Sequence, residues 1–221
     1  MVLIFDYDGT LHNTTHLYGC AFRRAYERLA ADGYAEKRYY SDEEMSRYLG
    51  MTADEMWQSF MPDLPTDIMK RTANEVGREM VNLISEGAAV LYDGIEEALS
   101  SLKDSGYTMV ILSNCHDEYL QAHRNYFRLD RWFDGYYAAE KFGYIPKENI
   151  FQFIQRDFPD EKYIVIGDRE SDFRVGTANG LKTVGCAYGF GNERELRGRP
   201  RSHPRLRRPG TLAPVVLRPA R

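Results

Sequence analysis

Two aspartates one residue apart, Asp6 and Asp8, follow the apolar run of residues 2–5 near the start of the chain. The run is rich in β-branched and aromatic residues, which predicts a short buried strand. Carboxylates that follow such a strand lie at the carboxyl edge of a sheet, where α/β proteins bind ligands. Two neighbouring carboxylates repel each other unless a cation neutralises them. The spacing therefore indicates either a Mg2+ site or an ordinary turn made by Asp and Gly9.

Further polar residues follow predicted strands later in the chain or precede a predicted helix. Ser113 and Asn114 follow a β-rich run, Asp168 follows an apolar strand with Asp172 four residues on, and Lys147 precedes a helix. Each of these residues by itself is typical of a turn, a helix cap or a solvated side chain. In a parallel sheet, however, the strand ends meet at one edge. Together the residues therefore predict a site that combines a hydroxyl, an ammonium group and several carboxylates.

The elements that must position these residues follow two patterns along the chain. Residues 14–85 contain four stretches with apolar side chains at helical spacing, which predicts a helical bundle. After residue 91, predicted helices alternate with apolar strands, a pattern typical of a parallel sheet covered by helices on both faces. The predicted strands are residues 2–5, 107–112, 136–139, 163–166 and 181–184.

We therefore predict an α/β protein in which one domain is inserted into another. Residues 1–13 and 87–192 form the sheet-containing core, and residues 14–86 form the helical insertion.

The distribution of charge and the number of cysteines limit the classes of function that this protein can have. Nine of the 29 basic residues but only two of the 33 acidic ones lie in residues 193–221, so the first 192 residues are acidic. An acidic body disfavours nucleic-acid binding. Cys20, Cys115 and Cys186 are widely spaced, which indicates reduced thiols in a cytoplasmic protein. There is no run of about 18 apolar residues and no secretory signal pattern, so we expect no membrane span.

Residues 193–221 differ in kind from the rest of the chain. They contain five of the nine prolines and are rich in arginine, a composition that predicts no regular core element. Three interpretations stay open: a disordered, solvated basic tail, an end produced by an altered reading frame, or an arm that binds an acidic partner. No feature of the sequence specifies an oligomeric state.

Four of these segments, in their order along the chain, resemble the motifs of the haloacid dehalogenase-like hydrolases. The segments are Asp6-Tyr7-Asp8-Gly9-Thr10, Leu112-Ser113-Asn114, a lysine, and Gly167-Asp168-Arg169-Glu170-Ser171-Asp172. The first, DxDGT, is highly specific. The resemblance spans residues 1 to about 190, and the helical insertion resembles the C1 cap of the phosphoglycolate phosphatase and β-phosphoglucomutase branch. It implies a Rossmann-like parallel sheet core with an inserted helical C1-type cap.

The resemblance also implies catalytic roles. Asp6 would attack phosphorus and form an aspartyl-phosphate, and Asp8 would protonate the leaving alkoxide and then activate water. Mg2+ would be held by Asp6, the carbonyl of Asp8 and Asp168. Asp172 would orient the lysine or a metal-bound water. The acid at position 8 favours phosphate chemistry, because family members that displace halide lack it.

Phosphate binding is implied for residues from several of these segments. They are Thr10, Ser113, Asn114, Lys147 and Gly50. The hydroxyl of Ser113, the backbone N–H of Asn114 and the lysine would hold the non-bridging oxygens as charge develops on them.

Several positions have more than one possible interpretation. Lys147 is favoured over Lys141 as the lysine of the site because it leads directly into a helix. Gly50 lies between two predicted helices, in either a substrate loop or an ordinary turn. His16 is either a surface or hinge residue or a contact to the leaving group, and Asn13 is treated as a hinge residue.

The predicted function is a Mg2+-dependent phosphatase that acts on a small phosphorylated metabolite, phosphoglycolate-like or a sugar phosphate. Three alternatives remain open at this level. The first two, an inorganic pyrophosphatase and a phosphosugar mutase, belong to the same branch of the family. The third is a regulatory module that binds phosphate without turnover.

Overall fold

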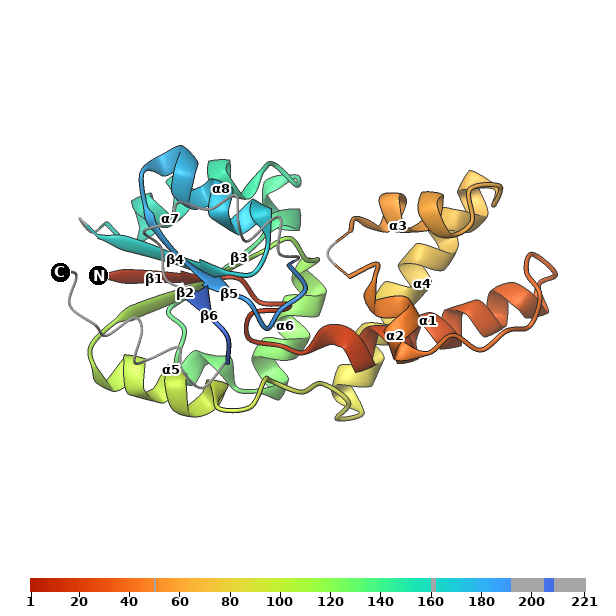
Figure 1. Ribbon diagram of the computed structural model, residues 1–221, viewed down its shortest axis with the longest axis horizontal. Helices are drawn as coiled ribbons and strands as arrows, with labels where there is room; N and C mark the ends of the chain where they lie inside the picture. The colour runs from red at the N-terminus through yellow and green to blue at the C-terminus, as the bar shows by residue number, and fades with distance from the viewer. Residues whose placement is uncertain (50, 160–161, 192–204, 209–221) are drawn as a thin grey trace. The chain divides into compact units, whose positions relative to one another are not determined.

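A parallel sheet forms the centre of one of the two units into which the chain divides (Figure 1). The computed structural model describes residues 1–49, 51–159, 162–191 and 205–208. The sheet unit comprises residues 1–13 together with the chain from Val90 onward, and the helical unit comprises Thr14–Ala89. No helix within the described ranges has the length and apolar character needed to cross a bilayer.

The sheet has the strand order β3-β2-β1-β4-β5-β6, and every pairing is parallel. Its strands are β1 (Val2–Phe5), β2 (Thr108–Ser113), β3 (Gly135–Ala138), β4 (Tyr163–Gly167), β5 (Lys182–Cys186) and β6 (Arg205–Leu206). All four residues of β1 are buried. This explains why β1 is continuously apolar, since a central parallel strand is covered on both faces.

In the described part of the sheet unit, four α-helices flank the sheet. They are α5 (Ile95–Asp104), α6 (Asp117–Tyr126), α7 (Lys147–Asp157) and α8 (Glu170–Asn179), with short 3-10 helices at Leu129–Arg131 and Ala139–Phe142. Figure 1 shows α7 and α8 on one face and α5 on the other. On the α7 face, Ile150 and Ile154 belong to the same buried apolar cluster as Ile4 of the central strand. The predicted α/β architecture is confirmed.

The helical unit consists of α1 (Thr14–Ala31), α2 (Asp42–Ser46), α3 (Ala53–Phe60) and α4 (Thr66–Ser85). Ser41 and Thr52 begin α2 and α3 with capping boxes, in which the cap side chain and the glutamate three residues later satisfy each other's backbone N–H. Phe22 of α1 packs in a cluster of aromatic rings that includes Trp57 and Phe60 of α3.

The prediction that residues 193–221 form no regular core element is wrong for Arg205–Leu206. These two residues form β6 beside β5, the side chain of Leu206 is buried, and the N–H of Ala187 donates to the carbonyl of Leu206 at 2.7 Å. The composition of the segment did not predict this strand, because the open edge of a sheet can pair with a segment whose intrinsic β-propensity is low. The rest of residues 193–221 lies outside the described residues, as does Gly50.

Candidate active site

The turn that follows β1 brings two carboxylates to the carboxyl edge of the sheet. The N–H of Asp6 donates to the carbonyl of Ile166 at 2.8 Å, which extends the pairing with β4 by one residue. Gly9 then reverses the chain with a φ of 84°. A Cβ at this position would lie 2.5 Å from Oδ2 of Asp168. The glycine is therefore required both by the backbone conformation and by the close approach of Asp168.

Lys147 joins two of the carboxylates of the site. Its Nζ lies 2.6 Å from Oδ1 of Asp6 and 2.7 Å from Oδ1 of Asp172, and all three residues are buried. Lys147 is the first residue of α7, directly after Pro146 at the N-cap. Proline is tolerated at the start of a helix because the first N–H groups of a helix have no partner within it. Lys141 instead forms an exposed ion pair with Asp117, so Lys147 is the lysine that contacts Asp6.

Asp168 follows β4 and is held by donors from two other segments. Its Oδ2 accepts hydrogen bonds from the N–H of Phe190 at 2.7 Å and of Gly191 at 3.2 Å. Its Oδ1 accepts a hydrogen bond from the hydroxyl of Thr10 at 3.2 Å. In this structure the buried hydroxyl of Thr10 donates to Asp168. The contact of Thr10 with phosphate therefore stays a prediction.

The site carries more negative than positive charge. Burial raises the pKa of Asp6 well above its ordinary value, and repulsion from Asp172 and Asp168 adds to this, against the attraction of Lys147. Burial and repulsion from Asp172 likewise raise the pKa of Asp168 to about 6. Burial lowers the pKa of Lys147, but attraction to Asp172 and Asp6 outweighs it and gives a net increase. One ammonium group thus faces three carboxylates, an imbalance that a bound cation would relieve.

The carboxylates of this site suit Mg2+. One carboxylate oxygen from each of Asp6, Asp168 and Asp172 lies within 4.8 Å of the others. Mg2+ prefers hard oxygen ligands and is commonly held by one or two carboxylates together with water and substrate phosphate. The donor atoms and the excess negative charge both fit such an ion.

Asp8 has partners different from those of Asp6. Its Oδ1 lies 2.9 Å from Nδ1 of His12 and accepts a hydrogen bond from the hydroxyl of Tyr119 at 2.8 Å. Burial and the charge of Asp8 raise the pKa of Tyr119 well above its ordinary value, so the phenol keeps its proton and donates. Burial lowers the pKa of His123 to about 2, and this neutral ring packs on His12 and Tyr119. Tyr119 and His12 therefore orient the Asp8 carboxyl group separately from the group around Lys147.

The predicted residues Ser113 and Asn114 lie where β2 ends. Ser113 is the last residue of β2, is buried, and pairs in register with Ala138 of β3. Because β1 and β2 are parallel and in register, Ser113 reaches the same sheet edge as Asp6. Asn114 is exposed just beyond it.

Some residues of the site were not predicted from the sequence. Tyr119 carries no signal of its own, because its contact with Asp8 depends on how α6 lies on the sheet. The loop of residues 189–191 carries a weak signal in its Gly-Phe-Gly pattern after a strand. A Cβ at Gly189 would collide with the carbonyl of Gly9, and one at Gly191 with the carbonyl of Asp168. The two glycines therefore let this loop close around Asp168.

The parallel sheet, with a group of carboxylates at its carboxyl edge, defines a Rossmann-like α/β core. The chain belongs to the haloacid dehalogenase-like hydrolases, whose family model matches residues 3–186. Within that family it is a phosphoric monoester hydrolase. The resemblance stated from the sequence motifs is confirmed.

Named relatives cover most of the chain. It is 26% identical over 205 residues to a 5'-nucleotidase of Pseudomonas aeruginosa, covering 91% of this chain and 89% of that protein. It is 22% identical over 194 residues to a phosphoglycolate phosphatase of Aquifex aeolicus, covering 86% of this chain and 85% of that protein.

The fold is also that of a solved protein. The structure of CbbY from Rhodobacter sphaeroides in complex with phosphate matches with a TM-score of 0.75 at 21% identity, covering 98% of this chain and 99% of that one.

Proposed function

We propose that the protein is a Mg2+-dependent phosphatase that hydrolyses a small phosphomonoester through an aspartyl-phosphate on Asp6. The observation that carries this proposal is the placement of Asp6, buried beside Lys147 and within 4.8 Å of two further carboxylates. A buried carboxylate held by an ammonium group is oriented for attack and shielded from water.

The contacts assign different tasks to the two oxygens of Asp6. Lys147 binds Oδ1, so Oδ2 is the oxygen to which we assign the attack on phosphorus. Asp172 holds Lys147 from the other side, and the N–H of Arg169 donates to Asp172 at 3.0 Å. Lys147 is therefore positioned to bind a phosphoryl oxygen as the bond to the leaving group breaks.

Asp8 is assigned to proton transfer. Its carboxylate is partly exposed and is held by Tyr119 and His12 rather than by Lys147. This leaves it able to give a proton to the leaving oxygen and later to take one from the attacking water. Two carboxylates in different surroundings can thus serve different roles in one site.

Asp6 and Asp168 would hold Mg2+, together with the carbonyl of Asp8. The ion would neutralise negative charge on the phosphoryl group and on the carboxylates. The role proposed for Asp172 is to orient Lys147, which its hydrogen bond at 2.7 Å supports.

We propose phosphoglycolate-like molecules or sugar phosphates as the leading substrate classes. The similarity to a phosphoglycolate phosphatase supports the first class, and the similarity to a 5'-nucleotidase adds nucleoside monophosphates to those worth testing. Inorganic pyrophosphate and a mutase reaction remain alternatives within the family.

We expect a cytoplasmic location, since Cys20, Cys115 and Cys186 are all free thiols.

The test is turnover of p-nitrophenyl phosphate, then of a panel of phosphorylated metabolites and pyrophosphate, with Mg2+ present. Asp6→Asn keeps the shape of the side chain but removes its nucleophilic charge, so we expect turnover to fall by a factor of about 1,000 or more. The control is Asp104→Asn, because Asp104 ends α5 and is exposed. Turnover that survives Asp6→Asn would exclude Asp6 as the nucleophile, whereas no turnover of any phosphate by the unaltered protein would favour a binding module.

A further inference from the structure

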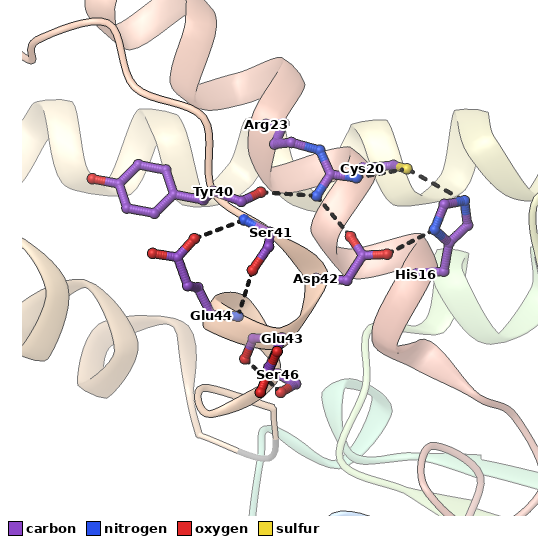
Figure 2. A network of polar contacts seen from close by, with 9 residues as sticks. All are labelled: His16, Cys20, Arg23, Tyr40, Ser41, Asp42, Glu43, Glu44 and Ser46. Carbon is purple, nitrogen blue, oxygen red and sulfur yellow. Dashed lines mark hydrogen bonds and ion pairs between the residues drawn. The ribbon is translucent and has the colours of Figure 1, made fainter.

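A second group of reactive side chains lies in the helical unit, on α1 and at the start of α2. Figure 2 shows the thiol of Cys20 and the imidazole of His16 directed toward each other. The two residues are one turn apart on α1, so they share a face of the helix. Nε2 of His16 lies 3.6 Å from Sγ of Cys20. This group shares no residue with the phosphoryl site.

Asp42 fixes the orientation of His16. Its Oδ2 lies 2.8 Å from Nδ1 of His16, and its Oδ1 accepts a hydrogen bond from Arg23 at 2.7 Å. Asp42 is the first residue of α2, next to the Ser41 cap, so its backbone is fixed by the capping box.

The charge on Asp42 determines which nitrogen of His16 carries the proton. Burial acts to raise the pKa of Asp42, but the hydrogen bonds from His16 and Arg23 outweigh it and hold the pKa below its ordinary value. An ionised carboxylate only accepts hydrogen bonds, so Nδ1 of His16 carries a proton. In neutral His16 the lone pair is then on Nε2, which faces the thiol. This order of nucleophile, base and orienting acid is the arrangement that activates a cysteine.

Arg23 adds a positive charge beside the sulfur. Its second terminal nitrogen lies 3.2 Å from Sγ of Cys20, and its other one donates to the carbonyl of Tyr40 at 3.0 Å. These contacts hold the guanidinium group in place, as Figure 2 shows. The guanidinium group therefore keeps a positive charge in contact with the Cys20 sulfur.

The other two cysteines lie in different surroundings. Burial and the nearby charge of Asp8 raise the pKa of Cys115 to about 12. Cys186 has no exposed surface, and burial raises its pKa as well. Cys20 is partly exposed, and its sulfur contacts both an imidazole and a guanidinium group.

We propose that Cys20 is a nucleophilic thiol that exchanges with low-molecular-weight disulfides, with His16 as its base. The Cys20 sulfur gives its proton to His16 and attacks one sulfur of the disulfide. A new S–S bond to Cys20 forms as the old S–S bond breaks, and the leaving thiolate takes the proton from His16. Cys20 is oxidised, one half of the disulfide is reduced to a thiol, and the product is a reversible mixed disulfide.

The test is the rate at which glutathione disulfide forms an adduct on the folded protein near pH 7, located by peptide mass spectrometry. We expect Cys20 to react about ten times faster in the folded protein than in the chain unfolded by urea. His16→Gln should remove most of this acceleration. The control is His116→Gln, because His116 is equally exposed and also pairs with a carboxylate.

Each outcome decides the proposal. Acceleration at Cys20 that His16→Gln lowers and His116→Gln leaves unchanged supports it. Equal rates in the folded and unfolded chains, labelling first at Cys115, or no effect of His16→Gln would overturn it. Thermal unfolding of each variant checks that the fold is kept, which is expected because the His16 side chain is 65% exposed. The readout needs no phosphatase activity, so it stands apart from the proposed function.

Discussion

The hydroxyl of Tyr119 donates a hydrogen bond to Asp8, the residue to which we assign proton transfer. Removing this single hydroxyl tests the assignment. In Tyr119→Phe, Asp8 keeps His12 but loses the hydrogen bond at 2.8 Å. We expect kcat to fall about tenfold for alkyl phosphates, whose leaving oxygen must be protonated. For p-nitrophenyl phosphate, whose leaving group is stable as an anion, we expect a much smaller loss. Steady-state kinetics on both substrates measures the difference.

The matched control for this variant is Tyr126→Phe, because Tyr126 is on the same helix but is exposed. An equal loss on both substrates would mean that Tyr119 acts through the fold or through hydrolysis of the aspartyl-phosphate, the step that both substrates share, and not through protonation of the leaving oxygen. No loss on either substrate would mean that His12 suffices to position Asp8.

Most of the site residues that the sequence could predict lie at strand ends. Asp6 and Asp168 directly follow apolar strands, so a parallel sheet places them together. Lys147 was predicted because it leads into a helix, and it contacts both Asp6 and Asp172. Tyr119 could not be predicted in this way, because its contact crosses 111 positions of the chain and depends on how α6 packs.

At the scale of elements, the turn after β1 depends on Gly9. Gly9→Ala places a side chain in the left-handed region and brings its Cβ to 2.5 Å from Asp168. We expect a loss of about 1–3 kcal/mol in the free energy of unfolding, together with loss of phosphatase activity. The control is Gly106→Ala, because Gly106 has a φ of 78° with nothing within 4 Å of the added Cβ.

The control separates the two effects of the Gly9 substitution. Gly106→Ala carries the same backbone strain, so its unfolding free energy should fall, but its turnover should be unchanged. If both variants lose turnover equally, general destabilisation rather than the contact with Asp168 is responsible. Chemical denaturation and turnover on one substrate measure both quantities.

The elements were largely predictable because their periodicity and caps are local, as Ser41 and Thr52 illustrate. β6 was not, because Leu206 becomes a strand residue only through the open edge of β5. No local propensity in an arginine- and proline-rich segment indicates that pairing. The contact of Tyr119 and the strand β6 were therefore not predicted for the same reason: both depend on tertiary contacts that the local sequence does not show.

At the scale of the whole molecule, the excess negative charge of the site links stability to pH and to the metal. Without a cation, the pKa of Asp168 is about 6 in the folded protein, above the value of about 3.9 expected for the unfolded chain. The folded state therefore holds the proton more tightly. Its contribution to stability is fully present below about pH 4 and is lost as the pH rises through about 6. Asp6, whose pKa is also raised, contributes with the same sign.

Mg2+ should reverse this loss, because it binds the ionised carboxylates of the folded state alone. At a concentration about 100 times its Kd, the ion would add about 2.7 kcal/mol to the free energy of unfolding. For a chain of this length we expect Tm to rise by about 5–10 °C near pH 8. We expect a much smaller rise near pH 5, where protons compete for the carboxylates. Thermal unfolding with Mg2+ or with EDTA at the two pH values measures this.

Asp168→Asn distinguishes this metal effect from a general effect of salt. The variant removes one charge from the site, so without metal it should be more stable than the unaltered protein near pH 8. It should also lose most of the rise in Tm with Mg2+. Calcium and sodium at matched ionic strength show whether the rise needs a divalent cation. A rise of equal size in the variant would mean that Mg2+ acts elsewhere on this acidic protein, and the site at Asp6 and Asp168 would have to be abandoned as the metal centre.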